Sequence, residues 1–279
     1  MRESLVQRNP LSLIRTLSID IVAGVLAVSY YFCRLFSTTL PHAYWISLGA
    51  AVWFIYLADH LADTHLPGNY SNKAELLALR DLRKLITRCL LVSLLILFVS
   101  LFFLPGKIIL YGFIGGVFVV TYLIINQIQN HTNRSFFSRE LVISLLYCLG
   151  TAGIPYLYGT ISDRYSGWFL SAFFLLILTN TLIFALTHYT GDVRQGVKSL
   201  AVILNYRNVR ILALLSGIMT CANFGWLIAQ SPYAVYGFLG LMMATTLLFL
   251  WIFLNKLSDT FIEMLADGIL ILPAVLLFI

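Results

Sequence analysis

The sequence predicts an all-helical membrane protein that crosses the bilayer about nine times. Hydrophobic residues make up 60% of the 279 residues, charged residues only 11%, and the mean hydropathy is +0.89. A soluble domain of this composition would have too little polar surface to cover itself. The apolar residues also come in runs of roughly 20, which is long enough to cross a hydrocarbon core about 30 Å thick.

The expected membrane segments follow one another with short connections. We therefore expect a single transmembrane domain over residues 1–279, built of two pseudo-repeated halves, with Asp-containing cytoplasmic loops near 56–84 and 188–208. The first apolar run is long and lacks a small-residue cleavage site, so it should remain as a helix rather than leave as a signal peptide. The approximate limits of the segments are 18–38, 42–58, 85–104, 107–126, 139–159, 167–187, 209–230, 233–254 and 258–278.

The basic residues predict the orientation of the chain. Lys and Arg number 18 against 12 Asp and Glu, but they lie in short connections between apolar runs, so membrane topology explains them and no nucleic-acid partner is expected. With a cytoplasmic N-terminus, all but three of the 18 face the cytoplasm; the exceptions are Arg34, Lys107 and Arg164. The pattern predicts a multi-pass protein of a bacterial inner membrane, in contact with its lipids, with both acidic loops cytoplasmic.

The first acidic motif lies where the second apolar segment meets water. Asp59 and Asp63 are one helical turn apart, so they share a face and repel each other unless a cation lies between them. Mg²⁺ takes carboxylate oxygens and fills its other positions with water and substrate phosphates. The pair therefore suits a metal-bound diphosphate, although two acids that merely solvate a helix end would look the same.

The second acidic motif follows the sixth apolar segment in an equivalent position. Asp192 can join a metal site there, and Arg194 and Lys198, four residues apart, can hold the oxygens of a departing diphosphate. Gly191 and Gly196 are expected to permit tight turns around the ligand. Cytoplasmic loops are basic in any case, so the two cations alone are weak indicators.

A basic stretch lies between the first motif and the third apolar segment. Ser71 or Asn72 is expected to cap a short amphipathic helix that runs through Lys84 and lies along the membrane interface. Such a helix could cover the acidic site as a lid, or anchor the loop to anionic lipid.

The two motifs resemble those of the UbiA superfamily of intramembrane prenyltransferases. The first motif of that family reads Asn-Asp-x-x-Asp-x-x-x-Asp, and its last two acids match Asp59 and Asp63. The second reads Asp-x-x-x-Asp, often continued by Gly-Ile-Lys-Ser; its last acid matches Asp192, and its continuation matches Gly-Val-Lys-Ser-Leu at 196–200. Two positions depart from the family pattern, because Tyr56 and His188 stand where the family has Asp.

The resemblance implies a Mg²⁺-dependent transferase. An allylic isoprenoid diphosphate would bind near the cytoplasmic face, lose diphosphate, and pass its isoprenoid group to an aromatic or other lipophilic acceptor. The resemblance assigns the catalytic metal site to Asp59, Asp63 and Asp192, and the diphosphate contacts to Arg139, Arg194, Lys198, Tyr122 and His188. Arg139 is equally compatible with an ordinary anchor at a helix end, and Tyr122 with the belt of aromatic residues at the membrane interface.

Three alternatives remain open at this level. A terpenoid cyclase of the same superfamily would use the same donor without an external acceptor. A catalytically lapsed relative that binds an isoprenoid lipid is favoured by Tyr56 and His188. Intramembrane acids such as Glu263 and Asp267 could indicate a transporter, but the sequence lacks the broken helix pair typical of one. Asp267 could instead accept a proton or hydrogen bond from the acceptor substrate, or pair structurally with an intramembrane or helix-end base.

Overall fold

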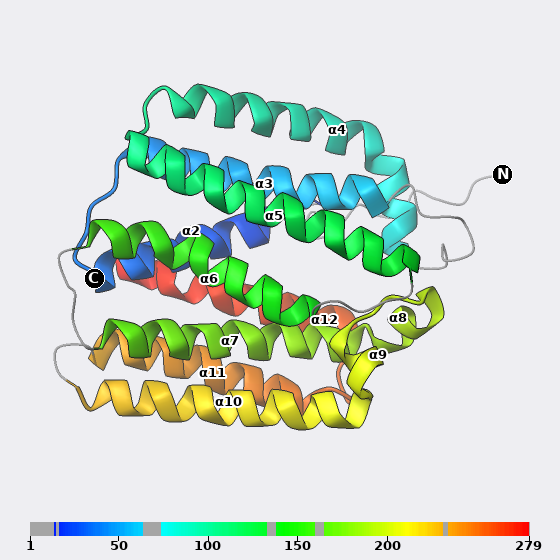
Figure 1. The fold of residues 1–279 in the computed structure, drawn as a ribbon. Helices are drawn as coiled ribbons and strands as arrows, with labels where there is room; N and C mark the ends of the chain where they lie inside the picture. The colour runs from blue at the N-terminus through cyan, green and yellow to red at the C-terminus, as the bar shows by residue number, and fades with distance from the viewer. Residues whose placement is uncertain are drawn as a thin grey trace. The chain divides into compact units, whose positions relative to one another are not determined.

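A computed structural model describes residues 14, 17–63, 74–132, 138–159, 165–230 and 234–278. Within these ranges the chain is helical and contains no strand, which confirms the predicted all-α class (Figure 1). Three short helical pieces accompany the longer helices: α8 (Tyr189–Gln195), α9 (Leu200–Leu204) and the 3₁₀ helix η2 (Ile269–Leu277). The longer helices are α2 (Ile19–Leu35), α3 (His42–Asp63), α4 (Ala74–Leu101), α5 (Gly106–Thr132), α6 (Arg139–Tyr158), α7 (Ser166–Thr187), α10 (Tyr206–Ile228), α11 (Ala234–Phe253) and α12 (Asp259–Gly268).

Each predicted apolar segment coincides with a helix of this series. In the described part of the chain, seven helices are long and apolar enough to cross a membrane: α4 from Leu82, α5 to Asn126, α6, α7, α10, α11, and α12 together with η2. The chain is therefore an integral membrane protein. Helix α2, with 17 residues, and α3 do not meet the same criterion, so the total of nine spans stays a prediction.

The segment near 56–84 is helical at both of its described ends, 56–63 and 74–84. Helix α3 runs on to Asp63, and α4 extends without a break from Ala74 to Leu101. The separate amphipathic helix ending at Lys84 was therefore wrong. Leu, Ala, Arg and Lys are all good helix formers, so nothing interrupts the helix between its charged and its apolar part. Ser71 and Asn72 lie outside the described residues.

The chain divides into two compact units. The first comprises Met1–Leu26 and Pro41–Pro105, and the second comprises Ala27–Leu40 and Gly106–Ile279. Helix α2 contributes to both, and each unit is described below by itself.

In the first unit, α3 and α4 pack side by side. Leu57 of α3 is completely buried against Ile86 and Leu82 of α4. The indole nitrogen of Trp53, one turn before Leu57, donates a hydrogen bond to the carbonyl of Leu17 at 2.8 Å. This stripe of α3 is thus fixed against α4 and the chain before α2.

The centre of the second unit is α7. It packs against α6, α10, α11 and α12 (Figure 1). Its apolar residues are distributed all round the helix, as expected for a buried helix. Two interhelical hydroxyl pairs add polar contacts that membrane helices commonly use: Ser144 with Thr181 at 3.2 Å towards α6, and Thr179 with Ser216 at 2.8 Å towards α10.

The last apolar segment changes its helical form part-way. Helix α12 ends at Gly268, and the chain continues as the 3₁₀ helix η2. Pro273 lies inside η2 and has no backbone N–H to donate to the preceding turn, which disfavours an α-helix there.

Close contact between α5 and α6 depends on a glycine. The hydroxyl of Tyr111 donates a hydrogen bond to the carbonyl of Leu149 at 2.8 Å, and the Tyr111 ring lies directly over Gly153. A Cβ atom at Gly153 would overlap this ring, whereas a Cβ at Gly150, one turn away, would meet nothing within 4 Å.

We therefore predict that Gly153→Ala destabilises the protein by about 1–3 kcal/mol, because Tyr111 must give up its hydrogen bond to make room. Gly150→Ala is the matched control and should be neutral or slightly stabilising. Unfolding in bicelles measures both. Equal effects of the two substitutions would contradict the packing described, as would an undiminished cost of Gly153→Ala in a Tyr111→Ala background.

Candidate functional site

The first acidic motif lies at the C-terminal end of α3. Because Leu57 faces α4, Asp59, two residues further on, lies about 200° round the helix, and its side chain is exposed. Tyr56 is half-buried. Asp63 is the last residue of α3, and its side chain lies outside the described part of the structure.

The second acidic motif is helical rather than a loop, which corrects the prediction for 188–208. After α7 ends, His188 leads directly into α8 (Tyr189–Gln195), and α9 (Leu200–Leu204) follows. Gly196 closes α8 in the left-handed conformation, with φ of 69°, as a helix-ending glycine does. The turn predicted at Gly196 is thus confirmed, whereas the turn predicted at Gly191 was wrong, because Gly191 lies inside α8.

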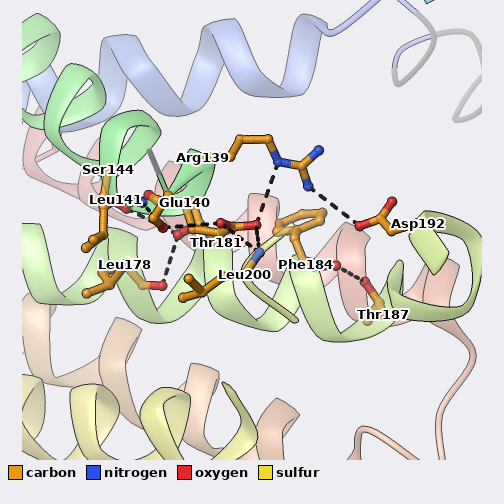
Figure 2. Close-up of polar contacts among 11 residues, drawn as sticks. Arg139, Glu140, Leu141, Ser144, Leu178, Thr181, Phe184, Thr187, Asp192 and Leu200 are labelled. Carbon is orange, nitrogen blue, oxygen red and sulfur yellow. Dashed lines mark hydrogen bonds and ion pairs between the residues drawn. The ribbon is translucent and has the colours of Figure 1, made fainter. Parts of the chain in front are cut away.

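Asp192 is a buried carboxylate in α8. Its Oδ2 atom makes no hydrogen bond to any residue that the structure describes, and the closest cation is the Arg139 guanidinium at 3.9 Å (Figure 2). Taking a carboxylate oxygen out of water without a hydrogen bond is costly unless a cation approaches it. The environment of Asp192 therefore fits a hard cation such as Mg²⁺, which prefers oxygen ligands.

Glu140, next to Arg139 at the start of α6, is a second buried carboxylate. Only 1% of the residue is exposed, and both carboxylate oxygens accept the backbone N–H of Leu200, at 3.1 and 3.2 Å (Figure 2). The Arg139 Nε atom lies 3.7 Å from the same carboxylate. The Arg139 guanidinium thus lies between the carboxylates of Glu140 and Asp192.

A third buried carboxylate, Glu263 of α12, pairs with His188. The two atoms, His188 Nε2 and Glu263 Oε1, are 3.0 Å apart, which is the distance of a hydrogen bond or, when the imidazole is protonated, of an ion pair. His188 directly follows the last residue of α7. The position where the UbiA pattern has Asp is therefore occupied by a histidine with a carboxylate partner from another helix.

The remaining residues predicted for the diphosphate lie apart from these contacts. Arg194 is exposed on α8, Lys198 is half-buried between α8 and α9, and Tyr122 is half-buried on α5. None of the ion pairs found among the described residues includes Arg194 or Lys198. Both cations therefore have no carboxylate partner within that part of the chain.

The structure brings Arg139 to Asp192 but gathers no complete metal centre. Among the side chains that it describes, which exclude that of Asp63, no three His, Cys, Asp or Glu residues are placed to hold one ion. Sequence reasoning missed Glu140 altogether and did not pair Glu263 with His188. The sequence did carry a signal for both: Glu140 and Glu263 are charged residues at or within apolar segments, and a charged residue there requires a partner.

Comparison with known proteins identifies the fold. No family model matches the sequence, and no curated protein matches it either. Among solved structures, a UbiA homologue from Archaeoglobus fulgidus bound to GPP and Mg²⁺ aligns over 96% of this chain and 100% of its own, with a TM-score of 0.66 and 13% sequence identity. The chain has the UbiA fold. The same homologue bound to DMAPP and Mg²⁺ aligns at a TM-score of 0.62 and 13% identity, over 95% of this chain and 99% of that one.

An apo UbiA homologue from Aeropyrum pernix K1 has the same architecture. Its TM-score is 0.65 at 13% identity, over 94% of this chain and 99% of its own. The fold predicted from two short acidic motifs is thus confirmed over almost the whole chain. At this identity the comparison concerns the UbiA fold alone, so the roles of individual residues have to be argued from this chain.

The His188–Glu263 contact predicts non-additive mutational effects. Glu263 is buried, so removing His188 takes a hydrogen-bond partner from a buried carboxylate, whereas removing both side chains leaves no such carboxylate behind. We expect His188→Leu to lower the unfolding free energy in the wild-type background and to cost about 1–3 kcal/mol less in a Glu263→Leu background. The four proteins of this cycle can be compared by unfolding in bicelles. Strictly additive effects would show that the two side chains do not interact.

Proposed function

We propose that this chain is an integral membrane prenyltransferase that binds an isoprenoid diphosphate together with Mg²⁺. It would transfer the isoprenoid group to an aromatic or other lipophilic acceptor. The observation that carries the proposal is the likeness, over nearly the full length of both chains, to a UbiA homologue bound to GPP and Mg²⁺. In addition, the present sequence retains three motif acids that the resemblance assigns to the metal: Asp59, Asp63 and Asp192.

In this proposal Asp59, Asp63 and Asp192 hold Mg²⁺. Asp192 supports it through its buried Oδ2 atom, which lacks a hydrogen bond within the described structure, and Asp59 through its exposed carboxylate on the face of α3 turned away from α4. When bound, Mg²⁺ neutralises charge on the diphosphate oxygens and so favours departure of the diphosphate.

The cationic residues of the second unit are proposed to bind the diphosphate. Arg194 and Lys198 supply positive charges that no carboxylate of the described chain neutralises. Arg139 lies at the first turn of α6, and its guanidinium can reach an anion beside Asp192. His188 and Tyr122 are proposed as further hydrogen-bond donors to phosphate oxygens.

The membrane setting suits this chemistry. An isoprenoid tail favours an apolar environment, and an allylic cation has to be kept from water. We propose that both acidic segments face the cytoplasm of a bacterial inner membrane, where water-soluble Mg²⁺ and diphosphate have access. The bias of Lys and Arg towards the connections on that side supports the orientation.

A second candidate is a lapsed relative that binds an isoprenoid lipid without reacting it. The specific observation in its favour is His188, which replaces a motif acid and engages Glu263 instead. A terpenoid cyclase would retain the metal site and differ only in its product. The assay below separates the three functions.

We predict Mg²⁺-dependent release of diphosphate from geranyl, farnesyl or geranylgeranyl diphosphate by the protein in lipid nanodiscs, with a membrane extract as the source of acceptor. Asp59→Asn and Asp192→Asn should each reduce release by at least about a hundredfold, because each removes a negatively charged oxygen ligand. Removal of Mg²⁺ by a chelator should stop it.

Asp259→Asn is the control, since Asp259 is an exposed acid outside both motifs. It should leave release unchanged. Mass spectrometry of the products distinguishes transfer from cyclisation. Binding of a prenyl diphosphate without any release would favour the lapsed relative, and neither binding nor release would contradict the proposed function.

A further inference from the structure

The carboxylate of Glu140 fixes a segment to which it is not adjacent in sequence. Leu200, whose N–H it binds, is the first residue of α9 and lies 60 residues further along the chain. Ser199 precedes α9, but its hydroxyl does not cap the helix and makes no hydrogen bond within the described residues. An N-cap side chain usually accepts the N–H of the second or third helical residue. Glu140 instead accepts the N–H of Leu200, the first residue of α9, which also has no partner inside the helix.

The same carboxylate also holds Arg139. The Arg139 Nε atom faces Glu140 at 3.7 Å, while its Nη2 atom faces Asp192 at 3.9 Å (Figure 2). Ser138 adds a hydroxyl 3.4 Å from Glu140 Oε2. A buried carboxylate is tolerated only when several such donors surround it, and removal of its charge loosens all of them together.

From these contacts we propose that Glu140 is a positioning residue. It holds Arg139 and the α8–α9 segment, residues 189–204, in the arrangement that binds a diphosphate group. Lys198 lies two residues before Leu200 on this segment, and Asp192 lies within it, so one contact fixes both a cation and an acid of the second motif. The identity of the ligand, a diphosphate, rests on the proposed function. The role of Glu140 in holding the α8–α9 segment does not.

Arg139 has a particular part in this arrangement. Its two ends face different carboxylates, and the 3.9 Å separation from Asp192 is longer than a hydrogen bond. If Asp192 bound a cation, the Nη2 atom of Arg139 would be free to donate a hydrogen bond to a phosphate oxygen. The Nε atom would still contact Glu140.

The test compares Glu140→Gln and Glu140→Ala with wild type. Glu140→Gln keeps the shape and one acceptor oxygen but loses the charge, and Glu140→Ala loses the contact entirely. Ser144→Ala is the matched control, because the Ser144 hydroxyl bonds to the backbone carbonyl of Glu140 at 2.7 Å and not to its carboxylate. Two quantities are measured in nanodiscs: hydrogen exchange at 196–204, and binding of inorganic diphosphate with Mg²⁺.

We expect Glu140→Ala to speed exchange at 196–204 by roughly tenfold or more, with a smaller effect of Glu140→Gln, since a hydrogen bond to a charged group is lost or weakened. Exchange in α7 and α10 should not change. Diphosphate binding should weaken in the same order by roughly tenfold or more, and Ser144→Ala should change neither quantity.

Unchanged exchange at 196–204 in both variants would overturn the proposal. Faster exchange with unaltered diphosphate binding would overturn it too, because Glu140 would then fasten the segment without serving the ligand. Faster exchange throughout the protein in Glu140→Ala would mean general unfolding. In that case the exchange rate at 196–204 and the diphosphate affinity of Glu140→Gln test the proposal. Wild-type protein that binds no diphosphate would contradict the proposed function. The exchange measurement would still test whether Glu140 holds the α8–α9 segment in place.

Discussion

The carboxylate of Glu140 and the backbone N–H of Leu200 form the contact on which the second acidic motif depends. At the edge of a membrane protein, a chain that leaves one helix and enters another has backbone donors that water does not fully satisfy. The chain satisfies one of them with a charged acceptor from α6, at 3.1 and 3.2 Å. The position of α9, and through it the link carrying Lys198, follows from that acceptor.

The charged residues of the second unit follow one physical rule. Each carboxylate buried near the helix ends in the described part of this unit lies beside a basic side chain, Asp192 and Glu140 beside Arg139, and Glu263 beside His188. The interior of α7, by contrast, carries only hydroxyl and amide groups among its buried polar residues. This distribution is what a low-dielectric interior requires, because unpaired charge is far more costly there than a hydroxyl pair. Charge is thereby concentrated where α6 begins and α7 ends.

The sequence predicted the helices well and the contacts between them poorly. The predicted limits 139–159 and 167–187 agree with α6 and α7 almost to the residue, because apolar composition marks where a helix enters the membrane. The segment 85–104 likewise agrees within a few residues with the membrane-spanning part of α4, Leu82–Leu101, but apolar composition did not reveal that the same helix begins at Ala74. Apolar composition also read 188–208 as a loop, although residues 189–195 form a helix.

The candidate site shows why tertiary contacts escaped the sequence. The positions of the acids, together with the family resemblance, indicated Asp59, Asp63 and Asp192, and the resemblance indicated Arg139. Nothing local indicates that Glu140 binds a backbone amide 60 residues away, or that His188 meets Glu263 of α12. Such pairings depend on how the helices pack, and the sequence periodicity of a single helix does not record them.

The most direct test of the central claim is the position of the metal. Crystals or single particles of the protein with Mn²⁺ and a non-ionisable thiolo analogue of geranyl diphosphate would locate it, by anomalous scattering or by density. The account predicts Mn²⁺ within about 2.5 Å of carboxylate oxygens of Asp59, Asp63 and Asp192. A bound analogue without metal at these carboxylates, or metal bound elsewhere, would contradict it.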